Sequence, residues 1–385
     1  MEPTRTGRPV VAVIGGGQLA RMMQESAIAL GVELRPLVEA ADGSTGLVVV
    51  AAKVGLPRDS DLVRDLVEGA DVLTFEHEHV PQDLLASLAD AVAIEPAPSA
   101  LLYAQDKLAM RERLTAMGAP CPRWARVDDV EQLRAFGDEG AWPVVVKTPT
   151  GGYDGHGVRV VKDPAEVADW FGKGPLLAEE LVPFVSEIAS LSARRPSGEI
   201  ASWPVASTEQ VDGVCSVVTA PAIGIREETR EAARALGERI AAELGVTGVL
   251  AVEMFVVGSG AGERVLVNEL AMRPHNTGHW TIDGAVTSQF EQHLRAVLDL
   301  PLGSTELLVP GSSSVMANLL GSSFDDPARA LGAALEGRPR ARVHIYGKQV
   351  RPGRKLGHVT VVDPDPARAR AAAEAAVAVL RGDED

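Results

Sequence analysis

Hydrophobic and polar positions follow three successive patterns along the chain. From residue 8 to about residue 100, apolar runs alternate with helix-forming segments. The run near residue 10 turns on three glycines, continues as a helical segment and resumes as an apolar run near residue 35, which is typical of a βαβ unit. A further strand is predicted at 71–75, before Pro81 ends the pattern. We therefore predict an α/β domain with a parallel sheet.

From about residue 122 the pattern changes to apolar strands joined by tight turns, which favours antiparallel pairing. A helical stretch at 100–117 leads into this part, and a helix at 227–244, followed by Gly245, interrupts it. The strands that we expect lie at 142–148, 157–163, 176–182, 187–195, 200–206, 249–257 and 264–271. The middle of the chain is thus predicted to be an α+β domain.

The last part of the chain predicts a small third domain. Apolar strands are expected at 313–321, 341–348 and 356–363, and an alanine-rich helix at 365–380. The length of 385 residues is enough for two or three hydrophobic cores. We expect domain limits at 1–105, 106–305 and 306–385.

Composition and charge narrow the range of partners. The net charge of −16 repels phosphate backbones, so nucleic-acid binding is not expected. No apolar run approaches the roughly 20 residues of a membrane span, and the N-terminal run has no cleavage site of small residues, so we expect a cytoplasmic protein. One basic cluster without acidic residues stands out against this background and predicts a small anionic ligand: Arg338, Arg340, Arg342, Lys348, Arg351, Arg354 and Lys355.

The first glycine turn fits a dinucleotide-binding fingerprint. Gly15, Gly17 and Ala20 match G-x-G-x-x-A after a strand, and Glu39 follows the second strand. Taken alone, this pattern indicates an NAD-dependent oxidoreductase. Any phosphorylated ligand at a helix N-terminus would satisfy it equally, and a purely structural turn is a further alternative.

A second glycine-rich segment lies between two predicted strands. Lys147 ends the first strand, four glycines follow at positions 151, 152, 155 and 157, and the second strand begins at once. A Walker loop would run into a helix instead. A glycine hairpin over a triphosphate, with a strand lysine on its phosphates, is the arrangement of protein kinases.

The predicted hairpin 249–271 carries a pair of carboxylates. Counting from its turn places Glu253 nearly opposite Glu269 on the adjacent strand. Facing carboxylates destabilise a sheet unless a cation lies between them, and magnesium is expected beside phosphates, with Asn268 as a neighbour. Two solvated edge glutamates are the alternative.

Two polar loops complete the candidate chemistry. Directly after Glu269, the segment AMRPHNTGHW concentrates Arg273, His275, Asn276 and His279, which suits binding of an anion. The segment 76–79, with sequence EHEH, resembles a metal site, but alternation would place Glu and His on opposite faces, so no metal is predicted there. Glu76 remains a candidate ligand contact, because the carboxyl ends of parallel strands line the crevice of α/β sheets.

The segments GGGQLARM, KTPTGGYDGHG, NELAMRPHNTGHWT and YGKQVRPGRKLGH strongly resemble the N5-carboxyaminoimidazole ribonucleotide synthetases, ATP-grasp enzymes of de novo purine synthesis. The resemblance spans nearly the whole chain. It implies an ATP-grasp fold with a Rossmann-like pre-ATP-grasp domain, a central ATP-grasp domain and a small C-terminal domain. It also implies a homodimeric ligase that converts ATP, bicarbonate and 5-aminoimidazole ribonucleotide, with Mg²⁺, into N5-carboxyaminoimidazole ribonucleotide, ADP and phosphate.

The resemblance also implies roles for individual residues. Lys107 and Lys147 would contact ATP phosphates, beneath the loop Gly152, Tyr153, Asp154, Gly155, His156, Gly157 and Val158. Glu179, Glu180, Leu181 and Val182 would contact adenine, Glu187 the ribose, and Glu253 and Glu269 the magnesium, with Asn268 beside them. Tyr153, Asp154, Arg273, His275, Asn276 and Lys348 would act on bicarbonate and the aminoimidazole, while the ribotide would contact Gly16, Gln18, Leu19, Glu76, Lys348, Arg351, Arg354 and Lys355.

Three positions depart from the family pattern. Near Ser207, in the segment STEQVDG, the family often has His, Asn or Glu, so no ATP contact is assigned there. His156 stands where the loop generally carries Arg or Lys, which makes its charge depend on pH near 6.5. Lys107 stands where some members have Arg, so it keeps the charge and lacks the bidentate fork. Three alternatives to the predicted ligase remain at this point: another ATP-grasp carboxylate-amine ligase, an NAD-dependent oxidoreductase, and an inactive relative that acts as a binding module.

Overall fold

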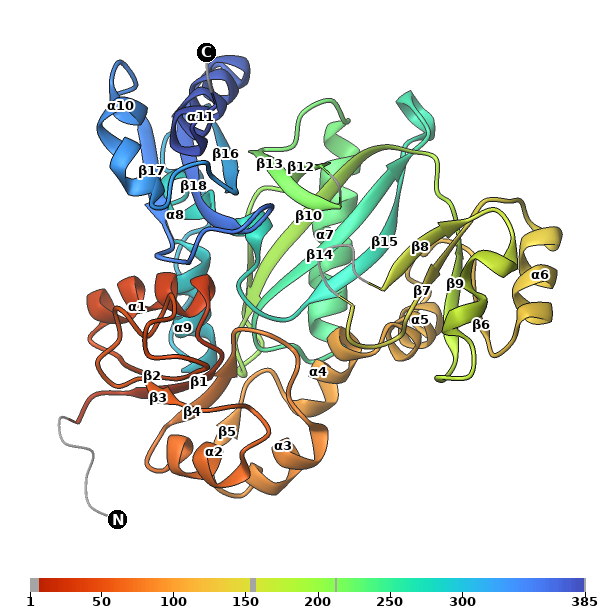
Figure 1. The fold of residues 1–385 in the computed structure, drawn as a ribbon, viewed down its shortest axis with the longest axis horizontal. Coiled ribbons are helices and arrows are strands. Elements are labelled where there is room, and N and C mark those ends of the chain that lie inside the picture. Colours follow the sequence, from red (N-terminus) through yellow and green to blue (C-terminus); the bar gives the residue numbers. More distant parts are fainter. Residues whose placement is uncertain (1–6, 153–156, 212, 384–385) are drawn as a thin grey trace.

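The first domain is a five-stranded parallel sheet with helices around it (Figure 1). The computed structural model describes residues 7–152, 157–211 and 213–383. The strand order β3-β2-β1-β4-β5 places β1 at the centre, where all its residues are buried. The elements are β1 (Val10–Ile14), α1 (Gln18–Leu30), β2 (Glu33–Val38), β3 (Lys53–Val54), α2 (Ser60–Val67), β4 (Val72–Phe75), α3 (Gln82–Leu88) and β5 (Ala93–Ile94). The predicted parallel α/β domain is confirmed.

Two helices connect this domain to a small antiparallel sheet. They are α4 (Pro98–Gln105) and α5 (Lys107–Ala116). The sheet has the order β6-β9-β7-β8 and carries α6 on one side. Its elements are β6 (Trp124–Val127), α6 (Val130–Glu139), β7 (Val144–Lys147), β8 (Val158–Val161), η1 (Pro164–Trp170) and β9 (Leu176–Glu180). The predicted strand-loop-strand at the glycine-rich segment is confirmed, since β7 and β8 pair antiparallel.

The third sheet runs through the rest of the molecule in the order β15-β14-β10-β12-β13-β16-β18-β17, with β11 beside β10. Its strands are β10 (Phe184–Arg194), β11 (Ile200–Ser202), β12 (Ala206–Val211), β13 (Val214–Ala220), β14 (Gly248–Val257), β15 (Arg264–Ala271), β16 (Ser313–Leu320), β17 (Ala341–Ile345) and β18 (Lys355–Asp363). Because β13 pairs with β16, the sheet continues across the predicted boundary between the second and third domains near residue 305. That domain boundary stays a prediction.

The helices of this half join the sheets to one another. The long helix α7 packs on β10 and β14, α9 lies between α1 and β14, and α11 covers β16 and β18. Figure 1 shows α9 beside α1, where the chain returns to the first domain. The helical elements are α7 (Glu227–Glu243), η2 (Gly260–Gly262), η3 (Asn276–Gly278), α8 (Thr281–Gly284), α9 (Gln289–Val297), η4 (Pro327–Ala330), α10 (Leu331–Leu335) and α11 (Pro366–Arg381).

The observed helices and strands differ from the predicted ones in two ways. The helical stretch 100–117 is two helices, because Asp106 is extended and its carboxylate accepts hydrogen bonds from the N–H groups of Leu108 and Ala109. Several elements have no predicted counterpart: the helices α3, α6, α8, α9 and α10 and the strands β3, β5, β6, β12 and β13. None of the helices among the described residues has the length and apolar character that crossing a bilayer requires.

Candidate active site

A cavity of about 1160 Å³ opens where the three sheets meet. Almost all the residues assigned a role by the sequence, where the structure describes them, line this one cavity. They are Gly16, Gln18, Leu19, Glu76, Lys107, Lys147, Gly152, Val158, Glu179, Glu180, Leu181, Val182, Glu187, Glu253, Asn268, Glu269, Arg273, His275, Asn276, Lys348, Arg351, Arg354 and Lys355. Gly157 borders the same loop but does not line the cavity, and Tyr153, Asp154, Gly155 and His156 lie outside the described residues.

The predicted carboxylate pair is formed by adjacent strands. Glu253 on β14 stands directly opposite Glu269 on β15, and a bulge follows at once, where Met254 pairs with Val267. The Glu253 side chain is recessed in the cavity, and this burial, together with the negative charges of Glu269 and Glu187, raises the pKa of Glu253 to about 8. Oxygen ligands and mutual repulsion are the properties of a site for a hard divalent cation. The pair therefore fits magnesium.

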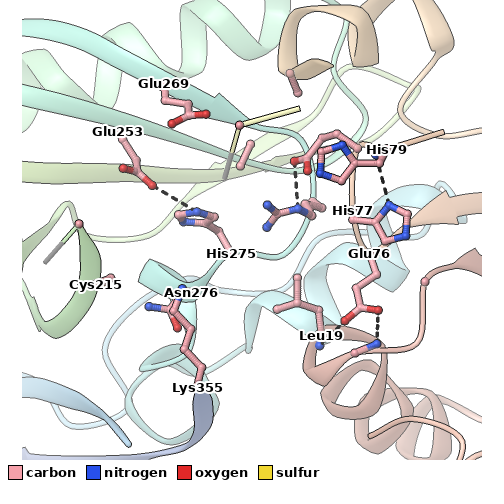
Figure 2. A pocket seen from close by; sticks show the side chains of 18 of the residues that line it. Leu19, Glu76, His77, His79, Cys215, Glu253, Glu269, His275, Asn276 and Lys355 are labelled. Atoms are coloured by element: carbon pink, nitrogen blue, oxygen red, sulfur yellow. Dashed lines mark hydrogen bonds and ion pairs between the residues drawn. The ribbon is translucent and has the colours of Figure 1, made fainter. Parts of the chain in front are cut away.

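A lysine and a histidine flank the two carboxylates. Lys107 Nζ lies 3.5 Å from Glu269 Oε1, and His275 Nε2 lies 3.2 Å from Glu253 Oε1 (Figure 2). Burial, followed by the positive charges of Arg273 and Lys355, holds the pKa of His275 well below its usual value of 6.5. The imidazole is therefore neutral at pH 7 and can ligate or accept a hydrogen bond.

A second lysine is fixed by a buried ionic network. Lys147 Nζ lies 2.6 Å from Glu179 Oε2 and donates to Asn268 Oδ1 at 3.2 Å. The other Glu179 oxygen accepts from Nε of Arg111 at 2.5 Å. Burial alone would raise the pKa of Glu179, but the charges of Lys147 and Arg111 outweigh burial and hold this pKa below its usual value. The Glu179 side chain thus orients Lys147, and residues 180–182, which follow it in sequence, line the same cavity.

The fully buried Arg111 is a site residue that the sequence analysis missed. Its guanidinium also donates to the backbone carbonyls of Val267 and Asn268, at 2.8 and 2.7 Å, so it ties α5 to the strand that carries Glu269. An arginine in a helix of ordinary composition gives no local signal, because its partners are 68 and more residues away in sequence.

The loop that carries His275 is fixed by hydrogen bonds with the Gln289 side chain. The Gln289 side chain accepts from the His275 backbone N–H and donates to its carbonyl, both at 2.8 Å. His275 Nδ1 lies 2.9 Å from the hydroxyl of Thr277. Gln289 is the first residue of α9 and is fully buried, so this helix fixes the loop. The sequence analysis missed this residue as well.

The glycine turn of the first domain does not leave its helix N-terminus open. The Glu76 carboxylate accepts from the backbone N–H groups of Gly17 and Leu19, the latter at 3.0 Å (Figure 2). A Cβ at position 17 would lie 2.5 Å from Glu76 Oε1, so glycine is needed there for this close approach. A carboxylate already occupies the place that a dinucleotide pyrophosphate would take. The geometry therefore argues against the NAD alternative.

The basic loop of the C-terminal part contacts the first domain directly. Lys348 donates to the Gln18 side chain, and the Ser44 hydroxyl donates to the Tyr346 carbonyl at 2.6 Å. Arg351, Arg354 and Lys355 line the same cavity. A cluster of cations beside the Gln18 helix suits a phosphate monoester, and it lies in the same cavity as the carboxylate pair.

Comparison with known proteins agrees with this arrangement. Family models match residues 9–105 as a ribonucleotide synthetase preATP-grasp domain, residues 112–290 as an ATP-grasp domain, and residues 314–372 as a phosphoribosylaminoimidazole carboxylase C-terminal domain. The N5-carboxyaminoimidazole ribonucleotide synthase of Mycobacterium tuberculosis is 50% identical over 372 residues, which cover 94% of this chain and 85% of the relative. The chain belongs to the N5-carboxyaminoimidazole ribonucleotide synthetase family.

Other members of this family give the same result. The synthase of Corynebacterium ammoniagenes is 48% identical over 368 residues, covering 93% of this chain and 89% of the relative. The Aspergillus clavatus synthase, solved with ADP and 5-aminoimidazole ribonucleotide, has a TM-score of 0.87 at 31% identity and covers 97% of this chain and 98% of its own. The predicted family and ATP-grasp fold class are thus confirmed.

Proposed function

We propose that this protein is the ATP-dependent ligase that carboxylates 5-aminoimidazole ribonucleotide with bicarbonate. The observation that carries the proposal is that two groups of opposite charge line one cavity. The first is the facing carboxylates Glu253 and Glu269, and the second is the cations Lys348, Arg351, Arg354 and Lys355. The first suits the magnesium of ATP, and the second suits the phosphate of a ribotide.

At the ATP end, Lys107 and Lys147 bind the phosphates beneath the glycine-rich loop. Residues 179–182 and Glu187 lie along the adenosine, and Phe184 and Phe255, whose rings are stacked 4.9 Å apart, add an apolar surface. Glu253 and Glu269 would hold magnesium, with Asn268 beside them. When bound, magnesium neutralises the phosphates and polarises the transferring phosphoryl group.

At the ribotide end, Gly16, Gln18, Leu19 and Glu76 complete the contacts from the first domain. Arg273, His275, Asn276 and Lys348 surround the reacting groups, and we assign Tyr153 and Asp154, which lie outside the described residues, to the same step. The reaction needs a charge-rich, enclosed site because bicarbonate is a poor electrophile.

The chemistry then follows in three steps. A bicarbonate oxygen attacks the γ-phosphorus of ATP, and the bond to the ADP oxygen breaks, giving carboxyphosphate. Carboxyphosphate separates into carbon dioxide and phosphate. The exocyclic amine of the ribotide attacks the carbon dioxide and loses one proton to the released phosphate or to the neutral imidazole of His275, giving the N5-carboxylate. The cations around the site stabilise each developing charge, and exclusion of water prevents loss of the intermediates.

The test is ATP hydrolysis with each substrate withheld in turn. We expect ADP release to require both bicarbonate and 5-aminoimidazole ribonucleotide for full rate, with one carboxylated product formed per ADP. ADP release that ignores the ribotide, or a product without added carbon, would contradict the proposal.

Two finer statements belong to the same proposal. We expect a homodimer in the cytoplasm, with the domain limits 1–105, 106–305 and 306–385. Sedimentation equilibrium of the purified chain tests the dimer, which a monomer mass at micromolar concentration would contradict.

A further inference from the structure

The short segment 76–79 of the first domain contacts two parts of the site. Glu76 accepts from Gly17 and Leu19 at the N-terminus of α1, on the ribotide side. Two residues on, Glu78 Oε1 lies 2.9 Å from Nε of Arg273, next to the loop of His275. The side chains of this pair are only 13% and 21% exposed, so solvent screens their attraction weakly. None of the roles proposed above uses Glu78.

The segment is also fixed to the connection between domains. The Gln105 side chain, at the end of α4, donates to the backbone carbonyls of Glu78 and Val80, both at 2.7 Å. Gln82 in turn donates to Gln105 Oε1 at 2.8 Å. Glu78 is therefore held on a rigid support, just before the chain enters the ATP-grasp domain at α5.

Arg273 is held much less firmly by its own surroundings. Among the described residues, the polar contacts of Arg273 are the ion pair with Glu78 and a hydrogen bond from Nη1 to the carbonyl of its neighbour Pro274 at 3.2 Å. Nε of Arg273 makes no hydrogen bond to a described residue, so the pair with Glu78 is chiefly electrostatic. Arg273 also lies near enough to Glu253 to act on its charge.

We propose that Glu78 is a positioning residue that holds Arg273 over the reacting bicarbonate and couples it to the first domain. The inference rests on the proposed function, because Arg273 is placed there beside the reacting groups. A guanidinium held in place keeps its donors toward the anion and away from Glu253 and Glu269. A misplaced guanidinium would compete with magnesium for those two carboxylates.

A kinetic double-mutant cycle tests the link. We expect Glu78→Gln, which keeps the shape and removes the charge, to lower kcat roughly 10- to 100-fold, with KM for ATP changed less than about threefold. The magnesium concentration for half-maximal rate should rise. Glu78→Gln added to Arg273→Gln should cost almost nothing more, because the pair acts as a unit. Glu33→Gln, which breaks the comparable Glu33–Arg35 pair of the same domain at 3.0 Å, is the matched control and should leave kcat unchanged.

A second measurement needs no substrate. Amide hydrogen exchange should speed up in residues 272–276 for Glu78→Gln and not for Glu33→Gln. The inference is overturned if kcat of Glu78→Gln is normal, or if amide exchange in residues 272–276 is unchanged. It is also overturned if the kcat losses of Glu78→Gln and Arg273→Gln multiply in the double variant. If the unaltered chain makes no carboxylated product, the proposed function fails, while the exchange result still decides whether Glu78 holds Arg273.

Discussion

At the scale of single residues, Arg111 and Glu179 organise the ATP end of the cavity. Both are almost fully buried, and each satisfies the other. Removing one partner of such a pair leaves an uncompensated buried charge, which costs more than the pair itself contributes. The placement of Lys147 depends on Glu179, so stability and ATP binding are linked through these residues.

We expect Arg111→Met to lower the free energy of unfolding by about 3 to 5 kcal/mol, because Glu179 loses one of its two buried cationic partners. KM for ATP should rise, because Glu179 then attracts Lys147 alone. Adding Glu179→Gln should restore part of the stability but not the affinity for ATP. Urea unfolding and initial rates measure the two effects. A loss below about 1 kcal/mol for the single variant would show that Arg111 is not needed to balance Glu179.

The same scale shows what the sequence could predict about the site. Glu253 and Glu269 could be found because pairing in a hairpin follows from counting outward from its turn. Counting from the turn places Glu253 only approximately opposite Glu269. The extra residue of the bulge, Asn268, brings the two glutamates directly opposite each other. Arg111, Glu78 and Gln289 act through partners that only the tertiary fold brings close, so no local pattern marks them. The NAD-like fingerprint misleads for the same reason, since Glu76 lies 59 residues from Gly17.

At the scale of elements, the start of α5 brings Lys107 to the cavity. Asp106 ends α4 and caps α5, and Lys107 N–H donates to the Pro149 carbonyl at 2.9 Å. The glycine-rich loop and the lysine helix are therefore joined at this point.

We expect Asp106→Ala to cost about 1 kcal/mol of stability and to raise KM for ATP several-fold, because the first turn of α5 frays. Asp129→Ala is the matched control, since Asp129 caps α6 by accepting from Gln132 N–H at 2.8 Å, away from the cavity. Thermal unfolding and ATP kinetics compare the two. Equal KM values for both variants would mean that the cap does not position Lys107.

Elements were predictable where their pattern is long. The helices α7 and α11 and the strands β10, β14, β15, β16, β17 and β18 lie within a few residues of the predicted segments, whereas β12 and β13 have no predicted counterpart. The helix α6 was missed because Gly137 and Gly140 weaken its pattern. A Cβ at position 137 would lie 2.2 Å from the Trp142 ring, so packing rather than helix propensity selects that glycine.

At the scale of the whole molecule, His293 joins the first domain to the large sheet. This fully buried residue of α9 accepts from the Val249 N–H at 3.1 Å, so its other nitrogen donates to the Thr74 hydroxyl on β4 at 2.9 Å. Burial lowers the pKa of His293 to about 3. In the unfolded chain, His293 has a pKa near 6.5. As the pH falls, the unfolded chain therefore binds a proton at His293 before the folded chain does.

The stability that His293 contributes is therefore complete above about pH 6.5 and is lost as the pH falls toward 3. We expect His293→Gln to be less stable than the unaltered chain at pH 7.5, by about 1 to 3 kcal/mol, and the difference to shrink at pH 5. Urea unfolding at several pH values measures it. A difference that stays constant from pH 8 to pH 5 would mean that the proton on His293 is not linked to folding.

The central claim for the molecule is that bicarbonate is activated by phosphorylation inside this cavity. The most direct test uses bicarbonate labelled with ¹⁸O, together with ATP, magnesium and 5-aminoimidazole ribonucleotide, and mass analysis of the phosphate at early times. The account predicts that each released phosphate carries one oxygen from bicarbonate while the product retains the labelled carboxylate. Phosphate whose new oxygen comes from water, with the carboxylated product still forming, would contradict it.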